Sequence, residues 1–229
     1  MKVFSIGDLH LPGSHDKTMD IFGSKWNNHF ERICDTWQEI VGKDDVVLIP
    51  GDISWAMKLE EAVEDLNSIA KLNGTKLIIK GNHDYWWNSL TKIRLLLPQG
   101  MSAIQNDSLS IGDFCFAGSR GWLCPGSSLF KEDDNKIYSR EVIRMRLSLS
   151  SADGGKRIIC MSHFPPFNEK RAPSGFTDLF EEFNVEHVVY AHLHDKACKG
   201  AFEGIKNEVC YRLVSCDHLD FKPVFITES

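Results

Sequence analysis

Side chains that can bind metal ions fall in five short clusters along the chain, and each cluster follows a short apolar run. The clusters are Asp8-Leu9-His10, Gly51-Asp52, Gly81-Asn82-His83-Asp84, Ser162-His163 and His192-Leu193-His194. Carboxylate, amide and imidazole ligands without a thiolate suit borderline or hard divalent ions such as manganese, iron or zinc. Metal-assisted chemistry is therefore the first prediction.

The number of candidate ligands predicts two metal ions. A structural zinc is usually a closed site of four ligands, often with cysteine, whereas two ions that share a carboxylate lie roughly 3.5–4 Å apart and need more ligands. Such a pair binds a water, lowers its pKa and clamps the oxygens of a phosphoryl group. The seven candidates are Asp8, His10, Asp52, Asn82, His163, His192 and His194.

The apolar runs before the clusters are typical of short buried strands. They cover residues 3–6, 46–49, 77–79, 158–161 and 188–190. Apolar residues at a spacing of three and four predict helices over 30–41 and 59–70, between the first three strands. This order predicts parallel strands with right-handed crossovers, whose carboxyl ends form a cleft. We therefore expect the five clusters to converge on one rim.

The rest of the chain continues to alternate between helix and strand. We predict helices over 85–97, 139–149 and 176–183. Short strands are expected over 103–105, 108–111, 114–117, 209–214 and 224–226, with a hairpin turn at Gly112-Asp113. The sequence has no linker, internal repeat or low-complexity tract, so a single domain over residues 1–229 is expected.

Composition and charge narrow the class of protein. The 229 residues are 42% hydrophobic and 25% charged, which is typical of a globular chain. A net charge of −6 argues against a general nucleic-acid binder, although two bound cations would still give one cleft a locally positive field. The substrate class that remains is a small-molecule or nucleotide-like phosphoester.

Hydropathy and cysteine usage predict a cytoplasmic protein. No stretch approaches the roughly 18 apolar residues of a membrane span, and the first run meets an acid after six residues instead of continuing as a signal peptide. The seven cysteines are odd in number and form no C-x-x-C pair, so we expect reduced thiols. The oligomeric state does not follow from the sequence.

The five clusters, in their order over residues 8–194, resemble the calcineurin-like metallophosphoesterase superfamily, whose pattern is D-x-H, G-D, G-N-H-D or G-N-H-E, H, and G-H-x-H. The resemblance implies an α/β fold, a four-layer α/β/β/α sandwich of two mixed sheets flanked by helices. It also implies two metal sites that share the carboxylate of Asp52. One would be formed by Asp8, His10 and His194, and the other by Asn82, His163 and His192.

The resemblance also assigns catalytic roles. His83 would face the substrate and protonate the leaving group or stabilise the transition state, and Asp84 would orient its ring. A metal-bridging hydroxide would attack a phosphodiester or phosphomonoester in line. Ile53-Ser54-Trp55 replaces the arginine-containing segment of the protein-phosphatase branch, which argues against a phosphoprotein substrate. Ala191 stands where the family often has glycine.

Two other functions are compatible with the same pattern. A binding scaffold could keep the fold without the chemistry, but such a protein is expected to have lost ligands, and all seven are present. A nuclease of the recombination-repair branch would need additional DNA-binding segments, for which the chain is short, and its acidic charge disfavours that reading.

Several residues outside the metal motifs have two plausible roles. Arg120 could contact a phosphate or form a surface ion pair. Four tryptophans could pack in the core or line a substrate wall: Trp55, Trp86, Trp87 and Trp122. Four histidines match no motif, and we expect them to be surface or hydrogen-bonded residues: His15, His29, His187 and His218. The loops over 11–27, 119–137 and 164–175 are expected to select the substrate.

Overall fold

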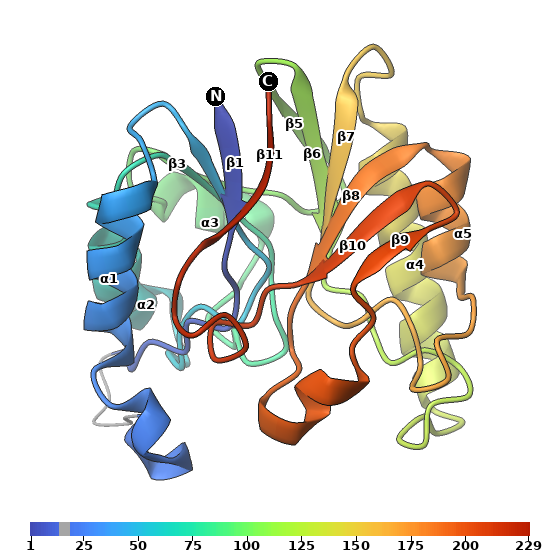
Figure 1. Ribbon diagram of the computed structural model, residues 1–229, viewed down its shortest axis with the longest axis horizontal. Coiled ribbons are helices and arrows are strands. Elements are labelled where there is room, and N and C mark those ends of the chain that lie inside the picture. The colour runs from blue at the N-terminus through green and yellow to red at the C-terminus, as the bar shows by residue number, and fades with distance from the viewer. Residues whose placement is uncertain (14–18) are drawn as a thin grey trace.

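Two β-sheets pack face to face, and helices cover the outer face of each sheet (Figure 1). The computed structural model describes residues 1–13 and 19–229. Both sheets are mixed, so the α/β/β/α sandwich expected from the family resemblance is confirmed. His15 lies outside the described residues.

The first sheet carries the N-terminal metal motifs. Its strands are β1 (Lys2–Ser5), β2 (Val46–Ile49), β3 (Thr75–Ile78), β4 (Met101–Ala103) and β11 (Val224–Glu228). The order is β11-β1-β2-β3-β4. Strands β1 to β4 pair in parallel and β11 is antiparallel to β1. The parallel start predicted from the sequence is confirmed.

The second sheet carries the C-terminal motifs. Its strands are β5 (Ser108–Ile111), β6 (Phe114–Ser119), β7 (Arg157–Ser162), β8 (Val185–Tyr190), β9 (Gly204–Lys206) and β10 (Val209–Leu213). The order is β5-β6-β7-β8-β10-β9. The four central strands are parallel, and the two edge strands are antiparallel to their neighbours.

The helices pack against the sheets through stripes of apolar side chains. They are α1 (His29–Ile40), α2 (Leu59–Ala70), α3 (Leu90–Leu96), α4 (Asp134–Ser150) and α5 (Gly175–Glu182). Helix α2 buries Ala62, Leu66 and Ile69 at a spacing of three and four against the first sheet. Helices α4 and α5 lie on the far side of the second sheet (Figure 1). In the described part of the chain, no helix is both long and apolar enough to cross a bilayer.

The space between the sheets is filled by side chains from both. Val46 and Leu48 of the first sheet share one buried cluster with Phe114, Phe116 and Met161 of the second. Every one of these side chains is at most 1% exposed. The facing sheets therefore form a packed core that fixes the carboxyl ends of their strands relative to one another.

The segment after the third motif differs from the prediction. The helix expected over 85–97 begins only at Leu90, where the hydroxyl of Ser89 accepts a hydrogen bond from the backbone N–H of Lys92. Before it, Trp86 and Trp87 bury their rings in the core, and Trp87 Nε1 donates to Gln105 Oε1 at 2.7 Å. Tertiary burial of two indoles thus overrides local helical periodicity.

Smaller differences lie at element ends. Strand β4 ends at Ala103, so the strand expected over 103–105 is displaced by two residues. Helix α4 begins at Asp134, earlier than predicted. Strand β9 and three 3-10 helices were not predicted, namely Met19–Phe22, Ser24–Trp26 and Asp195–Gly200.

Candidate metal centre

The five motifs meet at one edge of the two sheets. Asp8, Asp52 and Asn82 follow β1, β2 and β3 of the first sheet. The later motifs follow β7 and β8 of the second sheet. A backbone hydrogen bond of 2.7 Å, from Gly7 N to Val214 O, joins the two sheets at this edge. Both sheets therefore contribute ligands to the same place, as strand-end placement predicts.

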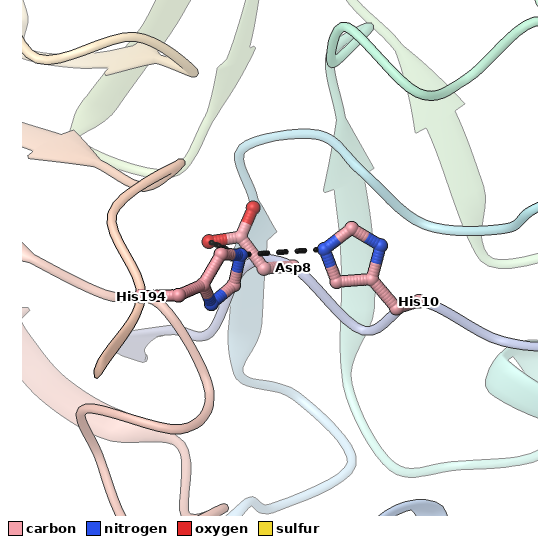
Figure 2. A group of neighbouring side chains, drawn as sticks. All are labelled: Asp8, His10 and His194. Carbon is pink, nitrogen blue, oxygen red and sulfur yellow. Dashed lines mark hydrogen bonds and ion pairs between the residues drawn. The ribbon is translucent and has the colours of Figure 1, made fainter. Parts of the chain in front are cut away.

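One group of three ligands combines the first motif with the last. Ligand atoms of Asp8, His10 and His194 all lie within 4.8 Å of one another, and Figure 2 shows the three side chains turned toward one point. His194 Nε2 is 3.4 Å from His10 Nε2 and 3.8 Å from Asp8 Oδ2. These three residues could hold one metal ion.

A second group lies beside the first. Ligand atoms of Asp52, His163 and His192 also lie within 4.8 Å of one another. Asn82 Oδ1 is 2.6 Å from His163 Nε2. Asp52 Oδ2 is 3.5 Å from His163 Nε2 and 3.9 Å from His10 Nε2. The Asp52 carboxylate thus lies between the two groups.

The hydrogen bonds leave nitrogen lone pairs facing the site. The carbonyl oxygen of Pro50 lies 3.0 Å from His163 Nδ1. A carbonyl oxygen can only accept a hydrogen bond, so Nδ1 is the ring nitrogen that carries the proton. His163 Nε2 then has a lone pair that faces the oxygen of Asn82 at 2.6 Å. Two acceptors at this separation repel each other unless a cation binds both. The donor set therefore fits a metal ion.

The backbone at the ligands is held in an uncommon conformation. Asp8, His10, Asp52 and His192 have φ of 56°, 46°, 52° and 74°, in the left-handed region. For a residue other than glycine this costs about 1 kcal/mol each. Bonds between the loops hold the conformation, including His10 N to Asp52 O at 3.0 Å. Backbone strain concentrated at ligands is typical of functional sites.

Two glycines allow the second and third motif loops to touch. A Cβ on Gly81 would collide with the carboxylate and backbone of Asp52. Gly51 has φ of 92°, and a Cβ there would come within 2.6 Å of Gly81 Cα. These positions therefore require glycine. Ala191 does not have a positive φ, so alanine fits where the family often has glycine.

Burial without a counter-ion shifts the pKa of the ligands. Burial raises the pKa of the Asp8 and Asp52 carboxyls above their usual range. It lowers the pKa of His163 to about 3 and that of His192 to about 2. A divalent cation favours carboxylates and unprotonated imidazoles. His163 and His192 are therefore already in the unprotonated form that binds a metal ion, whereas the carboxyls of Asp8 and Asp52 would lose their protons when a cation binds.

Asp217 supports the ligand His194 and was not predicted from the sequence. Its Oδ1 accepts a hydrogen bond of 2.7 Å from His194 Nδ1, and its Oδ2 accepts one from Lys25 Nζ, also at 2.7 Å. Although burial opposes it, the bond to Asp217 raises the pKa of His194 to about 9. Asp217 lies just beyond β10. Like the motif residues it follows a strand, and this position is the sequence signal from which it could have been predicted.

The carboxylate of Asp84 accepts hydrogen bonds from the backbone of two motif loops. Asp84 Oδ2 accepts from the backbone N–H of Asp52 at 2.8 Å and of Gly81 at 2.7 Å, and Oδ1 accepts from Ile53 N at 2.8 Å. His83 Nδ1 is buried and has no hydrogen-bond partner among the described residues. The carboxylate of Asp84 therefore joins the loops that carry Asp52 and Asn82 through their backbone N–H groups.

His83 lies at a cavity beside the ligands. The cavity is about 370 Å³ and is also lined by Trp26, Trp55 and Phe22. Trp55 packs its ring 4.6 Å from that of His83 and 4.8 Å from that of His10. Of the four tryptophans singled out in the sequence, Trp55 therefore belongs to the site, whereas Trp86 and Trp87 belong to the core.

The model of one protein family matches residues 1–196, and its description is calcineurin-like phosphoesterase. That match covers all five motifs. The chain belongs to the calcineurin-like phosphoesterase family.

Two curated proteins are similar to this phosphoesterase. A probable cyclic nucleotide phosphodiesterase of Coxiella burnetii is 22% identical over 204 residues, which cover 85% of this chain and 76% of that protein. The Gene 66 protein of Mycobacterium phage L5 is 35% identical over 79 residues, only 34% of this chain and 37% of that protein.

Two solved structures share the fold of this phosphoesterase. The phosphopantetheinyl hydrolase of Mycobacterium tuberculosis has a TM-score of 0.56 at 13% identity, and the match covers 93% of this chain and 88% of that one. A protein of Aquifex aeolicus has a TM-score of 0.52 at 13% identity, over 98% of this chain and 95% of that one. At this identity the likeness concerns the fold.

In this phosphoesterase, Arg120 does not line the cavity that holds His83. Its guanidinium lies 4.6 Å from the Trp122 ring and donates to Glu141 Oε1 at 3.1 Å. Its carbonyl accepts from the backbone N–H of His163 at 3.1 Å. Its ion pair joins it to the buried Glu141 and so differs from the surface pair that was one of its two expected roles, and the side chain lines a different cavity.

Three histidines outside the motifs have ordinary partners. His29 Nε2 is 2.9 Å from Leu9 O. His187 and His218 lie 3.4 and 3.1 Å from carboxylates of Glu186 and Glu203. These contacts agree with the expectation that they are surface or hydrogen-bonded residues.

Proposed function

We propose that this phosphoesterase hydrolyses a small phosphodiester or phosphomonoester with two divalent cations, Mn, Fe or Zn. One observation carries the proposal. Two groups of ligand atoms, each within 4.8 Å, lie side by side with the Asp52 carboxylate between them. The first ion would be held by Asp8, His10 and His194, and the second by Asn82, His163 and His192, with Asp52 shared.

Two bound cations would supply an activated water and stabilise the charge that develops on the phosphoryl group. Side chains of the protein would position the reacting groups and transfer the proton. His83 borders the cavity and its backbone N–H donates to Asp52 Oδ1 at 2.8 Å, which fixes the residue beside the shared ligand. We assign it the protonation of the leaving oxygen. Asp84 would act by holding the loops of Asp52 and Asn82.

The cavity walls favour a substrate with an aromatic substituent. The partly buried Trp55 borders the same space as His83 and His192, and Phe22, 54% exposed, lies at its edge. Indole rings bind flat groups such as nucleobases by stacking. A nucleotide-like phosphoester is therefore the substrate class that we propose. The description of the Coxiella burnetii relative is in keeping with it.

A screen of substrates and metals tests this proposal. Purified protein loaded with manganese, iron or zinc is assayed with bis(4-nitrophenyl) phosphate, 4-nitrophenyl phosphate and cyclic nucleotides. We expect hydrolysis of at least one ester and its loss in His83→Ala, with His187→Gln, whose ring lies beside Glu186 and outside the ligand set, as the control. Absence of hydrolysis for every ester and metal would overturn the proposal.

We also propose a cytoplasmic location. All seven cysteines are described, and each is a free thiol, which is typical of a reducing compartment. Cell fractionation with an antibody against the chain is the corresponding test.

A further inference from the structure

A second cavity, of about 300 Å³, lies between the ends of β3, β4 and β6 and helix α4. Its lining includes four basic residues, Lys80, Arg120, Arg140 and Arg144, and one acid, Glu141. Within the described residues it shares no lining residue with the cavity at the metal ligands. It is therefore a separate site.

The charge of this cavity is opposite to that of the chain. Four cations face one carboxylate, whereas the whole protein carries a net charge of −6. Glu141 is fully buried, and a single oxygen, Oε1, accepts from Arg120 Nη2 at 3.1 Å and from Arg144 Nη1 at 2.8 Å. One carboxylate can hold two guanidinium groups in place but can neutralise only one.

Donors remain available to a ligand. Arg120 donates from Nη2 to Glu141, and its guanidinium carbon lies 4.6 Å from the centre of the Trp122 ring. Its Nε and Glu141 Oε2 are both buried, and neither has a hydrogen-bond partner among the described residues. Lys80 and Arg140 form no ion pair with any described residue. Gln105 gives its oxygen to Trp87, which leaves its amide N–H groups as donors.

We propose that this cavity binds a phosphate-bearing molecule independently of the metal ions. Fixed guanidinium groups with a surplus of positive charge suit phosphate oxygens, which accept several charge-assisted hydrogen bonds at once. The phosphate could belong to the far end of the substrate or to a separate phosphorylated molecule. Either occupant would lie behind the metal loops, because Lys80 is two residues before Asn82 and the Arg120 carbonyl binds His163 N.

Calorimetric titration of the full chain with pyrophosphate tests the inference. Chelator-treated protein isolates the cavity, because it lacks the cations that would bind pyrophosphate at the metal centre. We expect binding to the wild type and a loss of about tenfold in affinity for Arg140→Gln and for Lys80→Gln. The matched control is Arg146→Gln, on the same helix, whose side chain pairs with Glu182 on the surface. Circular dichroism checks that each variant is folded.

Failure of pyrophosphate to bind the wild type, or equal affinity of wild type and Arg140→Gln, would overturn the inference. Kinetics with manganese-loaded enzyme then separate the two sources of phosphate. If the substrate supplies it, Arg140→Gln raises KM for a dinucleoside polyphosphate and leaves KM for 4-nitrophenyl phosphate unchanged. If a separate molecule supplies it, neither KM changes. Pyrophosphate binding by a protein that hydrolyses no ester would contradict the proposed function alone.

Discussion

Asp217 holds His194 by a hydrogen bond of 2.7 Å from His194 Nδ1 to Asp217 Oδ1. The bond places the proton of the neutral ring on Nδ1 and turns Nε2 toward Asp8 and His10. A carboxylate behind a metal-binding imidazole also increases the basicity of the ligand nitrogen. Asp217 is therefore a positioning residue for one of the two proposed ions.

Asp217→Ala should weaken the affinity for one manganese ion by about 10–100-fold, because the His194 ring loses both its orientation and its charge partner. The other ion should bind as in the wild type. Asp220→Ala is the matched control, since Asp220 is exposed and pairs with Arg32. Calorimetric titration with manganese measures both sites, and an unchanged affinity in Asp217→Ala would disprove the positioning role.

Metal binding should release protons and strengthen as pH rises. Although burial opposes it, the bond to Asp217 raises the pKa of His194 to about 9, so this ring is protonated at pH 7 in metal-free protein. Burial also raises the pKa of Asp8 above its usual range. A cation must displace these protons, so affinity should rise up to about tenfold per pH unit per proton between pH 6 and 8.5. Titrations in buffers of different ionisation enthalpy count the protons, and no net release at pH 7 would contradict this prediction.

Asp84→Asn tests whether this residue supports the loops or the ring of His83, to which we assign the proton transfer. The amide can accept at one oxygen only, so at least one of the buried N–H groups of Asp52, Gly81 and Ile53 loses its acceptor. We expect a loss of about 2–3 kcal/mol in the free energy of unfolding and weaker metal binding. The pH profile of the residual kcat should keep its shape. A shifted pH profile with unchanged stability would instead support contact with the His83 ring.

Lys76 should stabilise the end of helix α2. Its side chain is buried, and Nζ donates to the carbonyls of Ala70, Leu72 and Gly74 at 3.0, 2.7 and 2.8 Å. Lys76→Met would leave these carbonyls without a donor at the negative end of the helix dipole, a loss of about 3 kcal/mol. Urea unfolding measures it, with the exposed Lys222→Met as control. Equal midpoints for the two variants would refute the role.

The fold and the convergence of the candidate ligands on one edge could be predicted because their signals are local. Each ligand follows a short apolar strand, and parallel strands bring their carboxyl ends to one edge. Asp52 and His163 are 111 positions apart in sequence, yet strand-end position alone indicated their proximity.

The supporting residues could not be predicted because their partners are set by tertiary packing. Asp217 meets His194 only after β8 and β10 pair in parallel. Asp84 follows His83 in sequence but turns to the N–H groups of another loop. The basic cavity combines three strand ends with helix α4, and no spacing in the sequence shows that Arg120 and Arg140 face the same space.

The number of metal ions needed for hydrolysis tests the two-metal site most directly. Manganese is titrated into chelator-treated protein while hydrolysis of bis(4-nitrophenyl) phosphate is followed, with Asp52→Asn in parallel. Two sites that share Asp52 predict that activity reaches its maximum at two ions per chain and that Asp52→Asn stays at least about 100-fold lower. Full activity at one ion per chain, or an Asp52→Asn variant as active as the wild type, would contradict it.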